Sequence, residues 1–338
     1  MKLWTILPAV ALGLGLQAPL SAQEPFYGGK TLRIIVGTTP GGGLDTYSRA
    51  IARHMGRHIP GNPTIVVENM PGAGSLILAS HLYKVAKPDG LSIGNFVGDI
   101  VMTQLLGRPG VEADFLKFGY IGVPLRDFNA CGLTKASGVT SVERWMAAKT
   151  PVKLGSTAPG TSTDNTPRIL RGLLGLPIQT VTGYKGTAEI RLAAESGEIA
   201  GGCWTWGSMR TTWRKALQSG EVVVVLQNRA EPHPELPTVP LTVDLAKTRE
   251  ARELLLASDP SPIIFTYALA PGSPNERLQT LRKAFMDTMK DPEFLSDAAK
   301  SQLAIDPMAG EELEKTVTRI LKLDPALVAK LKEVLALK

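Results

Sequence analysis

Short apolar runs alternate with helical patterns along most of this 338-residue chain, and no other feature constrains its fold as strongly. The first unit shows the pattern: an apolar run at 31–37 leads into a glycine-rich turn at 38–45, and an amphipathic run follows to residue 59. At 152–155 another apolar run leads into a second turn, rich in glycine, serine and threonine. Strand, turn and helix repeated in this order predict an α/β fold with mostly parallel sheets covered by helices.

The periodicity also places the individual elements. Strands are expected at 31–37, 64–67, 91–97, 118–123, 130–133, 152–155, 178–182, 199–204, 222–226 and 263–269. Helices are expected at 44–59, 74–86, 100–106, 142–148, 168–174, 188–196, 207–217, 243–257, 274–289, 292–301, 311–321 and 325–335.

The turn Thr38–Asp45 suits an anion. Its three glycines leave the backbone free to bend and place no Cβ in the way of an approaching group. The helix that follows begins with free N–H groups and a partial positive charge, so it can hold a carboxylate or a phosphate through the main chain. An acidic side chain aimed at a carboxylate would repel it, so Asp45 and Asp164, which follow the two turns, are expected to be helix caps.

Length and composition indicate an exported protein with two domains. A chain of this length exceeds one ordinary core, and its 43% hydrophobic and 20% charged residues are those of a globular protein. Residues 1–22 combine a basic start, an apolar core and small residues before Gln23, which is the pattern of a secretory signal peptide. No later run is apolar over the roughly 18 residues that a membrane helix needs, so we expect a soluble mature protein.

Charge and cysteine content exclude several other classes. The net charge of +6 falls to about +5 with the signal peptide removed, because Lys2 is its only charged residue. The basic residues are not interleaved with aromatics, so no nucleic acid is expected as a partner. Cys131 and Cys203 are the two cysteines, and the sequence leaves open whether they form a disulfide in an oxidising compartment. No histidine lies near either one in sequence, so no metal site is expected.

An exported α/β hydrolase is the alternative of another class. Gly90–Gly94 has the letters of a nucleophile elbow around Ser92, but the elbow needs a strand before the serine and a helix after it, and Ser92 falls inside a strand pattern. His54 and His58 are spaced as in a helical metal site, but the glutamate of the zinc-protease motif is missing. We therefore expect a binding protein without catalytic residues and without a cofactor.

Five segments, in order along the chain, resemble the substrate-binding proteins of tripartite tricarboxylate transporters, the TctC or Bug family. They are Pro40-Gly41-Gly42-Gly43-Leu44-Asp45, Glu68-Asn69-Met70-Pro71-Gly72-Ala73-Gly74, Pro88-Asp89-Gly90, Gly155-Ser156-Thr157-Ala158-Pro159-Gly160-Thr161 and Tyr184-Lys185-Gly186. The resemblance covers nearly the whole mature chain, from about Lys30 to about Leu321.

The resemblance implies a fold of the periplasmic binding protein type, type II-like, with a mixed, mostly parallel sheet in each of two domains and a ligand cleft between them. Domain I would comprise residues 23–126 plus 227–338, and domain II residues 127–226. The resemblance also implies a monomer in the periplasm that holds a small carboxylate between its two glycine loops. The partners would be the membrane subunits of a tripartite tricarboxylate-type transporter.

Ligand-binding residues follow from the two loops and from the neighbouring motifs. They are expected to be Thr39, Pro40, Gly41, Gly42, Gly43, Ser156, Thr157, Gly160, Thr161, Ser162, Tyr184, Lys185, Trp204 and Trp206. The two tryptophans alternate at a strand end, so they are expected to face the same way and to shape the deep side of the cleft.

The sequence departs from the family pattern in the second half of the clamp. Ala158 replaces the middle glycine of the second loop, and Asp164 stands where a histidine is frequent. The ligand therefore stays open between a di- or tricarboxylate, an amino acid and an aromatic acid that could stack on tryptophan. It also stays open whether the closed protein feeds a transporter or a sensor kinase.

Overall fold

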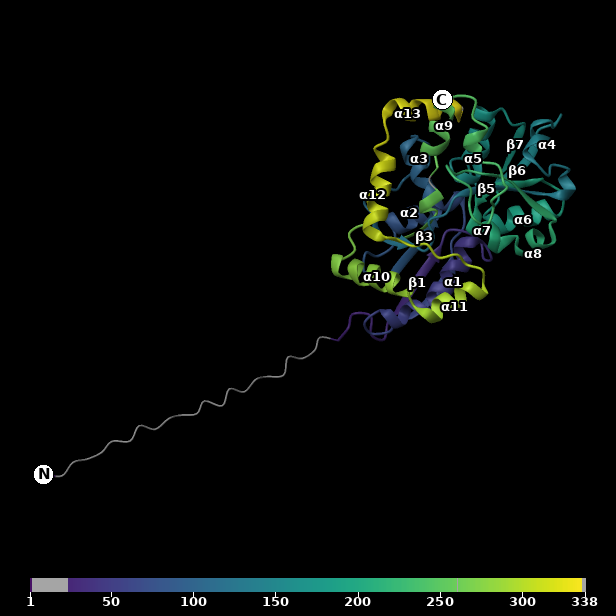
Figure 1. Ribbon diagram of the computed structural model, residues 1–338. Helices are drawn as coiled ribbons and strands as arrows, with labels where there is room; N and C mark the ends of the chain where they lie inside the picture. The colour runs from purple at the N-terminus through teal and green to yellow at the C-terminus, as the bar shows by residue number, and fades with distance from the viewer. Residues whose placement is uncertain (2–23, 260, 336–338) are drawn as a thin grey trace.

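The computed structural model describes residues 1, 24–259 and 261–335 (Figure 1). The predicted signal peptide, apart from Met1, lies outside the described residues. Two β-sheets, each covered by helices, make up the molecule. No helix within the described residues combines the length and the apolar character needed to cross a membrane.

The first sheet has six strands, four of which point the same way. Strands β1 to β3 pair in parallel around β1, whereas β10 and β11 run antiparallel to their neighbours. Across the sheet the order is β11 (Met308–Ala309), β4 (Gly119–Val123), β10 (Phe265–Leu269), β3 (Ser92–Val97), β1 (Thr31–Val36) and β2 (Thr64–Asn69).

The second sheet has five strands, and β5 alone among them runs against the rest. Its order is β7 (Ile178–Thr182), β6 (Val152–Ser156), β8 (Gly201–Thr205), β5 (Asn129–Thr134) and β9 (Val222–Gln227). The reversed strands β5 and β10 each follow a passage of the chain from one sheet to the other, which explains their direction. The expectation of two mixed sheets with mostly parallel strands is therefore confirmed.

Helices cover both sheets. Those against the first sheet are α1 (Gly43–Met55), α2 (Leu76–Lys84), α3 (Val101–Leu105), α10 (Asn275–Thr288), α11 (Pro292–Lys300) and α12 (Gly310–Leu321). Those around the second sheet are α4 (Val142–Met146), α5 (Ser162–Leu174), α6 (Thr187–Glu195), α7 (Trp206–Thr212) and α8 (Arg214–Ser219). Short 3-10 turns complete the described chain: η1 (Gly56–His58), η2 (Ala73–Ser75), η3 (Gly98–Ile100), η4 (Lys135–Ser137), η5 (Thr242–Asp244) and η6 (Ser261–Ile263).

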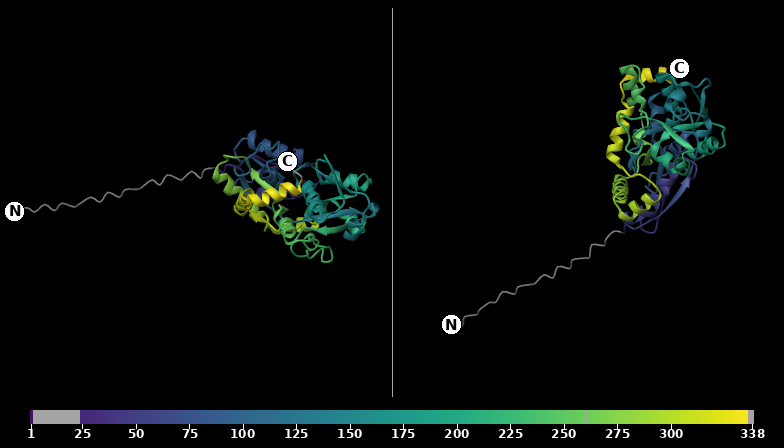
Figure 2. Two further views of the ribbon diagram at one scale, coloured as in Figure 1. Left: turned by 90° about the horizontal axis from the view of Figure 1, so that it is seen from above. Right: turned by 45° about the vertical axis from the view of Figure 1, so that its right-hand side comes forward.

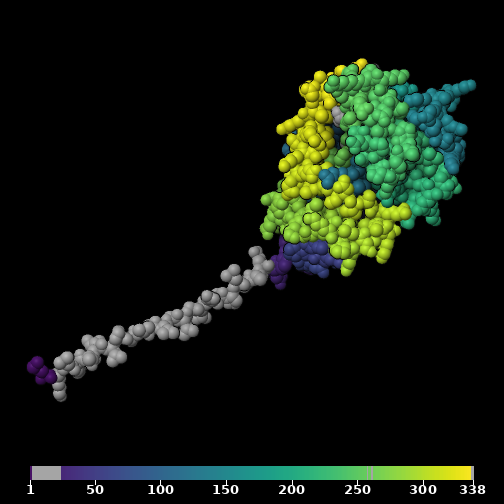
Figure 3. Space-filling view, in the orientation of Figure 1, coloured from purple at the N-terminus to yellow at the C-terminus, as the bar shows by residue number. Residues whose placement is uncertain are grey.

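Two further helices, α9 (Arg249–Ala257) and α13 (Pro325–Val334), pack against α5 at the top of Figure 1. Buried leucines of both helices belong to the hydrophobic core of the second sheet, although they lie outside residues 127–226. The C-terminal part of the chain therefore contacts both halves. In the views of Figure 2 the segment 127–226 lies to one side of the remaining chain. In Figure 3 the C-terminal part of the chain, coloured green to yellow, covers much of the visible face beside the teal segment.

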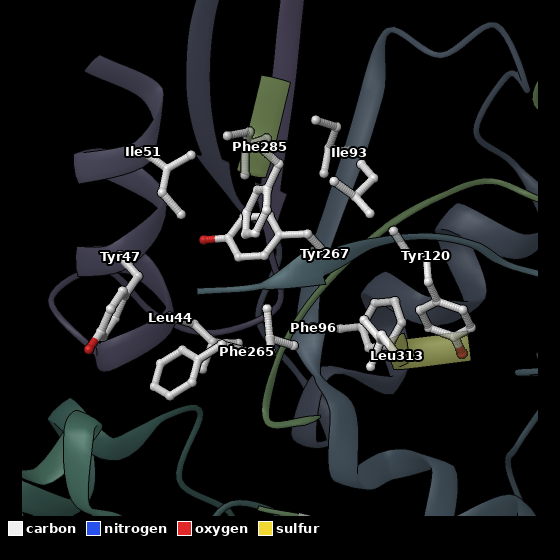
Figure 4. Packing of buried hydrophobic residues seen from close by; sticks show 14 of the residues in the cluster. Leu44, Tyr47, Ile51, Ile93, Phe96, Tyr120, Phe265, Tyr267, Phe285 and Leu313 are labelled. Carbon is white, nitrogen blue, oxygen red and sulfur yellow. The ribbon is translucent and has the colours of Figure 1, made fainter. Parts of the chain in front are cut away.

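Aromatic side chains fill the core of the first sheet (Figure 4). The rings of Tyr47 and Phe265 lie 4.7 Å apart and join α1 to the reversed strand β10. The hydroxyl groups of Tyr267 and Ser48 are 2.9 Å apart, so the one polar atom that Tyr267 buries has a partner. This packing fixes the start of α1 against the strand ends.

Three predicted helices differ clearly in extent. Helix α5 begins at Ser162 and not at 168, and the helix expected at 207–217 is two helices, α7 and α8. The pattern predicts a single helix at 243–257, but the structure has the 3-10 turn η5 and then α9 from Arg249. Thr248 caps α9 by accepting a hydrogen bond from the backbone N–H of Ala251 at 3.1 Å. This new N-terminal cap explains why the helix begins there.

The question of the two cysteines is answered by the pairing of the strands that carry them. Cys131 of β5 and Cys203 of β8 are directly opposite one another and form a disulfide, with their Cα atoms 4.0 Å apart. Both side chains are buried. The bond ties the reversed strand β5 to its neighbour.

Candidate functional site

The first glycine loop joins β1 to α1 and is held in shape by Asp45. Gly41 has a φ of +81°, which glycine adopts without strain, and Gly42 is the N-cap residue. The Asp45 carboxylate accepts hydrogen bonds from the N–H of Gly41 at 2.9 Å and from Arg49 Nε at 2.9 Å. Burial alone would raise the pKa of Asp45, but these hydrogen bonds and one from Asn69 hold it below its ordinary value.

The second glycine loop, between β6 and α5, repeats this arrangement. Gly160 has a φ of +97°, and the N-cap residue is Thr161. The Asp164 carboxylate accepts from the N–H of Gly160 at 3.2 Å and from Arg168 Nε at 2.9 Å. In both loops the aspartate lies in the first helical turn and reaches back, so the expected N-cap position is wrong although the capping contact exists. Each aspartate is also balanced by an arginine one turn later.

The first loop meets the helices of the second sheet across a closed cleft. A Cβ on Gly43 of α1 would lie 2.5 Å from Ser208 Oγ of α7, so the two backbones approach closely. A Cβ on Gly186, before α6, would lie 2.8 Å from Thr39 Oγ1. Elements of the first sheet therefore contact the second sheet's helices directly, with the glycines allowing the approach.

A small cavity of ≈ 40 Å³ lies at this meeting point. The N-terminal residues of α1, α5 and α6 line it, so three partial positive charges converge there. The lining residues in the described chain are all uncharged: Thr38, Gly43, Leu44, Val97, Thr157, Thr161, Ser162, Thr163, Gly186, Thr187, Trp204, Thr205, Ser208 and Ile264.

Three buried donors near this cavity have no hydrogen-bond partner within the described chain. They are the hydroxyl groups of Thr38 and Thr39 and the indole N–H of Trp204. Thr38 is 8% exposed and Trp204 2% exposed, so water does not satisfy them freely. A buried donor without a partner costs about 1–3 kcal/mol, and an acceptor between the two loops would remove that cost.

The cavity brings together five of the residues expected from the sequence: Gly43, Thr157, Thr161, Ser162 and Trp204. Others stand beside it. Pro40 and Gly41 are exposed, Gly42 is the N-cap residue behind Gly43, and Thr39 contacts Gly186. Ser156 is fully buried with its hydroxyl 3.4 Å from Thr163 Oγ1, and a Cβ on Gly160 would meet Thr103 and Arg108 rather than the cavity.

Tyr184, Lys185 and Trp206 are directed elsewhere. The Tyr184 hydroxyl donates to Glu198 at 2.7 Å, and the Lys185 side chain is exposed. Strand β8 ends at Thr205, so Trp206 begins α7 and does not continue the strand alternation. Its indole N–H donates to Glu235 at 2.7 Å. The expectation that Trp204 and Trp206 face the same way along one strand is therefore wrong.

Several lining residues were not expected. Thr38 and Thr163 adjoin predicted residues, and Thr187 directly follows the Tyr-Lys-Gly segment, so neighbouring positions carried a signal for them. Val97, Ser208 and Ile264 come from distant segments that only the folded chain brings together. Trp204 stacks on Trp213, with ring centroids 4.7 Å apart, which leaves its edge for the cavity.

Two buried carboxyl groups lie beside this region. Asp99 of η3 is fully buried, and burial raises its pKa to about 7. Asp127, which precedes β5, is nearly as buried, and burial raises its pKa to about 7 as well. The Asp127 oxygens accept from the N–H groups of Phe128 and Gly207, each at 2.8 Å. The charge of Asp259 raises the pKa of both groups further.

Ser92, His54 and His58, the residues whose spacing resembles catalytic or metal-binding motifs, lie in a strand or in ion pairs. Ser92 is the first residue of β3, which continues to Val97, so no helix follows it as an elbow requires. His54 and His58 pair with Asp297 and Asp291 of the α11 region at 3.0 and 2.8 Å. Within the described residues, no group of three or more side chains is placed to bind a metal ion.

Comparisons with known proteins agree with the resemblance found in the sequence. No protein-family model matches the chain. A UPF0065 protein of Bordetella pertussis is 26% identical over 309 residues, which are 87% of this chain and 87% of the relative. A UPF0065 protein of Cupriavidus necator is 25% identical over 334 residues, with 96% and 94% of the two chains covered.

Solved structures show the same fold. The periplasmic binding protein BugD matches with a TM-score of 0.72 and 21% identity over 91% of this chain and 98% of its own. A protein of R. palustris solved with adipate matches with a TM-score of 0.72 and 19% identity over 91% of this chain and 98% of its own. A TctC solute-binding protein from Polaromonas matches with a TM-score of 0.58 and 19% identity over 90% of this chain and 99% of its own. The chain thus has the two-domain fold of periplasmic binding proteins, and its resemblance to the TctC or Bug family is confirmed.

Proposed function

We propose that this chain is an exported solute-binding protein of the periplasm that captures a small carboxylate between its two glycine loops. It then delivers the ligand to a membrane transporter of the tripartite tricarboxylate type. The domains that close are proposed to be residues 23–126 plus 227–338, and residues 127–226. The protein carries out no chemical step on its ligand.

One observation carries this proposal: three helix N-termini converge on a cavity whose buried donors lack acceptors. An anion placed there would interact with the positive ends of α1, α5 and α6. It would also accept hydrogen bonds from the Thr38 hydroxyl and the Trp204 indole. Because the lining residues of the described chain are uncharged, dipoles and neutral donors must provide the binding.

A carboxylate is favoured over other anions by the comparison with the relatives. The R. palustris protein of the same fold was solved with adipate, a dicarboxylate. The cavity of ≈ 40 Å³ holds little more than one carboxyl group, so the structure corresponds to a cleft that has closed.

Closure of hinged domains is the proposed mechanism. The chain passes between the sheets from β4 to β5 and returns after β9. Near these passages, Leu125 pairs with Asp306 and Gln227 pairs with Leu241. A ligand that contacts α1 on one side and α5 and α6 on the other binds the closed state better, so it shifts the population towards closure.

A thermal-shift screen tests the proposal on the mature protein. The compounds are monocarboxylates, di- and tricarboxylates, amino acids, aromatic acids and inorganic phosphate. We expect carboxylates alone to raise the melting temperature. The variant Thr38→Val should weaken the best hit, whereas Thr64→Val on the exposed start of β2 should not. Stabilisation by phosphate alone, or equal hits in wild type and Thr38→Val, would contradict the assignment.

A further inference from the structure

The two glycine loops differ in how many of their hydroxyl groups lack a hydrogen-bond partner in the described chain. In the second loop several N–H groups are already bonded: Thr157 N–H donates to Thr163 Oγ1 at 3.0 Å, and Gly160 N–H donates to Asp164 at 3.2 Å. Thr161 N–H donates to the Ala158 carbonyl at 3.3 Å. The first loop, in contrast, leaves the Thr38 and Thr39 hydroxyl groups without acceptors in the described chain.

Asp99 occupies one further N–H group at the start of α5, that of Ser162. It lies in η3, directly after β3 of the first sheet, and one of its oxygens accepts from the backbone N–H of Ser162. The Ser162 hydroxyl bonds to the same carboxyl group. The first N–H group of α5, that of Ser162, is therefore occupied by a carboxylate of the protein itself, which reaches it across the cleft. A second carboxylate from a ligand cannot take the same place.

The other oxygen of Asp99 has no partner. Asp99 is 0% exposed, and its Oδ1 is buried without a hydrogen-bond donor among the described residues. A buried charge is costly unless it is paired, and here burial raises the pKa of the carboxyl to about 7, with the nearby charge of Asp259 acting in the same direction. Asp99 does not line the cavity itself, but it bonds to Ser162, which does. An unpaired acceptor thus lies next to a site whose Thr38 and Trp204 donors lack acceptors in the described chain.

We propose that Asp99 determines ligand specificity by selecting a carboxylate that also carries an amino group. The ligand carboxylate binds the first-loop donors, and its ammonium group donates to Asp99 Oδ1. A dicarboxylate is disfavoured, because its second charge would face Asp99 while the start of α5 is already occupied. This inference rests on the proposed function and names the ligand class of the same cleft.

Calorimetric titration with matched compounds tests the inference. The pairs are 4-aminobutyrate against glutarate, 6-aminohexanoate against adipate, and alanine against propionate. In the first two pairs a second carboxylate replaces the ammonium group, and in the third pair the ammonium group is simply absent. We expect the amino compound of the best-fitting pair to bind at least about tenfold more tightly to the wild type, because a charge-assisted hydrogen bond is gained.

The variant Asp99→Asn removes the charge and keeps an acceptor for Ser162. We expect it to lose the preference for the amino compound, with the two members of the pair then binding within about threefold of one another. Asp127→Asn is the matched control, because Asp127 is also buried near Asp259 but both of its oxygens are already bonded. This control should keep the wild-type preference.

The outcomes separate the inference from the proposed function. Tighter binding of the dicarboxylate by the wild type, or an unchanged preference in Asp99→Asn, overturns the role of Asp99 while leaving a carboxylate site in place. Binding by no compound of any pair overturns the proposed function and the inference with it. If Asp99→Asn does not fold, the wild-type preference alone decides, since a preference for dicarboxylates contradicts the proposal.

Discussion

Replacing Gly43 by alanine is expected to block full closure of the cleft without disturbing either domain. A Cβ at this position would lie 2.6 Å from the Cβ and 2.9 Å from the Cα of Ser208. The serine hydroxyl could rotate away, but the Cα is part of the α7 backbone. Gly43 is the first residue of α1, where alanine is as compatible with the helix as glycine.

The magnitude follows from the geometry. Carbon atoms in contact normally stay about 3.5–4.0 Å apart, so relief of the 2.6 Å contact with Ser208 Cβ requires α1 and α7 to separate by roughly 0.9–1.4 Å. That displacement weakens at least one charge-assisted hydrogen bond between the ligand and one side of the cleft, at a cost of about 1.5–3 kcal/mol. The expected loss of affinity is about 10- to 150-fold. The free energy of unfolding should change by less than about 1 kcal/mol.

Titration calorimetry with the best hit of the screen measures the affinity, and small-angle X-ray scattering measures compaction on binding. The neighbouring variant Gly42→Ala is the control, because a Cβ there has its nearest contacts at 3.5 Å. It should bind within about threefold of the wild type. A Gly43→Ala protein that binds and compacts like the wild type would refute the idea that this glycine allows closure.

Three further variants test separate parts of the account. The substitution Asp99→Asn should raise the free energy of unfolding more at about pH 8 than at about pH 5 in urea titrations. Its folded pKa of about 7 exceeds the value of roughly 4 in the unfolded chain, so the cost of the buried charge grows as pH rises between them. Trp204→Phe should weaken ligand binding by about two- to tenfold in calorimetry through loss of one hydrogen bond, whereas Trp206→Phe, whose indole N–H is bonded elsewhere, should not. Replacing both Cys131 and Cys203 by alanine should lower the free energy of unfolding by about 2–4 kcal/mol, as should reduction of the wild type, and a stability unaffected by reductant would contradict the bond.

Local patterns in the sequence were sufficient to predict the sheets and the first half of the cleft. The run before Thr38 and the helix after it are continuous in the chain, so strand, turn and helix N-terminus could be placed together. For the second loop the strand and the turn were placed, but the helix was expected from residue 168, whereas α5 begins at Ser162 and continues through Pro167. Resemblance to known proteins added the passage of the chain between the two sheets, which the element order alone did not reveal.

Contacts between distant segments could not be predicted. Ser208 meets Gly43, and Asp99 meets Ser162, only because the two halves of the chain close on each other. The prediction for Trp206 failed because the chain turns into α7 at this residue, so the strand alternation does not extend from Trp204 to Trp206. Whether Tyr184 and Lys185 bind ligand stays a prediction, and their positions away from the cavity do not favour it.

If an anionic ligand binds against the first glycine loop, a negative charge placed at Gly42 should repel it. Asparagine and aspartate are both favourable N-cap residues, so Gly42→Asn and Gly42→Asp should fold equally well while differing by one charge. At about 4 Å from a carboxylate that charge is worth roughly 4 kcal/mol near a protein surface. We expect the calorimetric affinity to be at least about 100-fold lower for Gly42→Asp than for Gly42→Asn. Equal affinities in the two folded variants would contradict it.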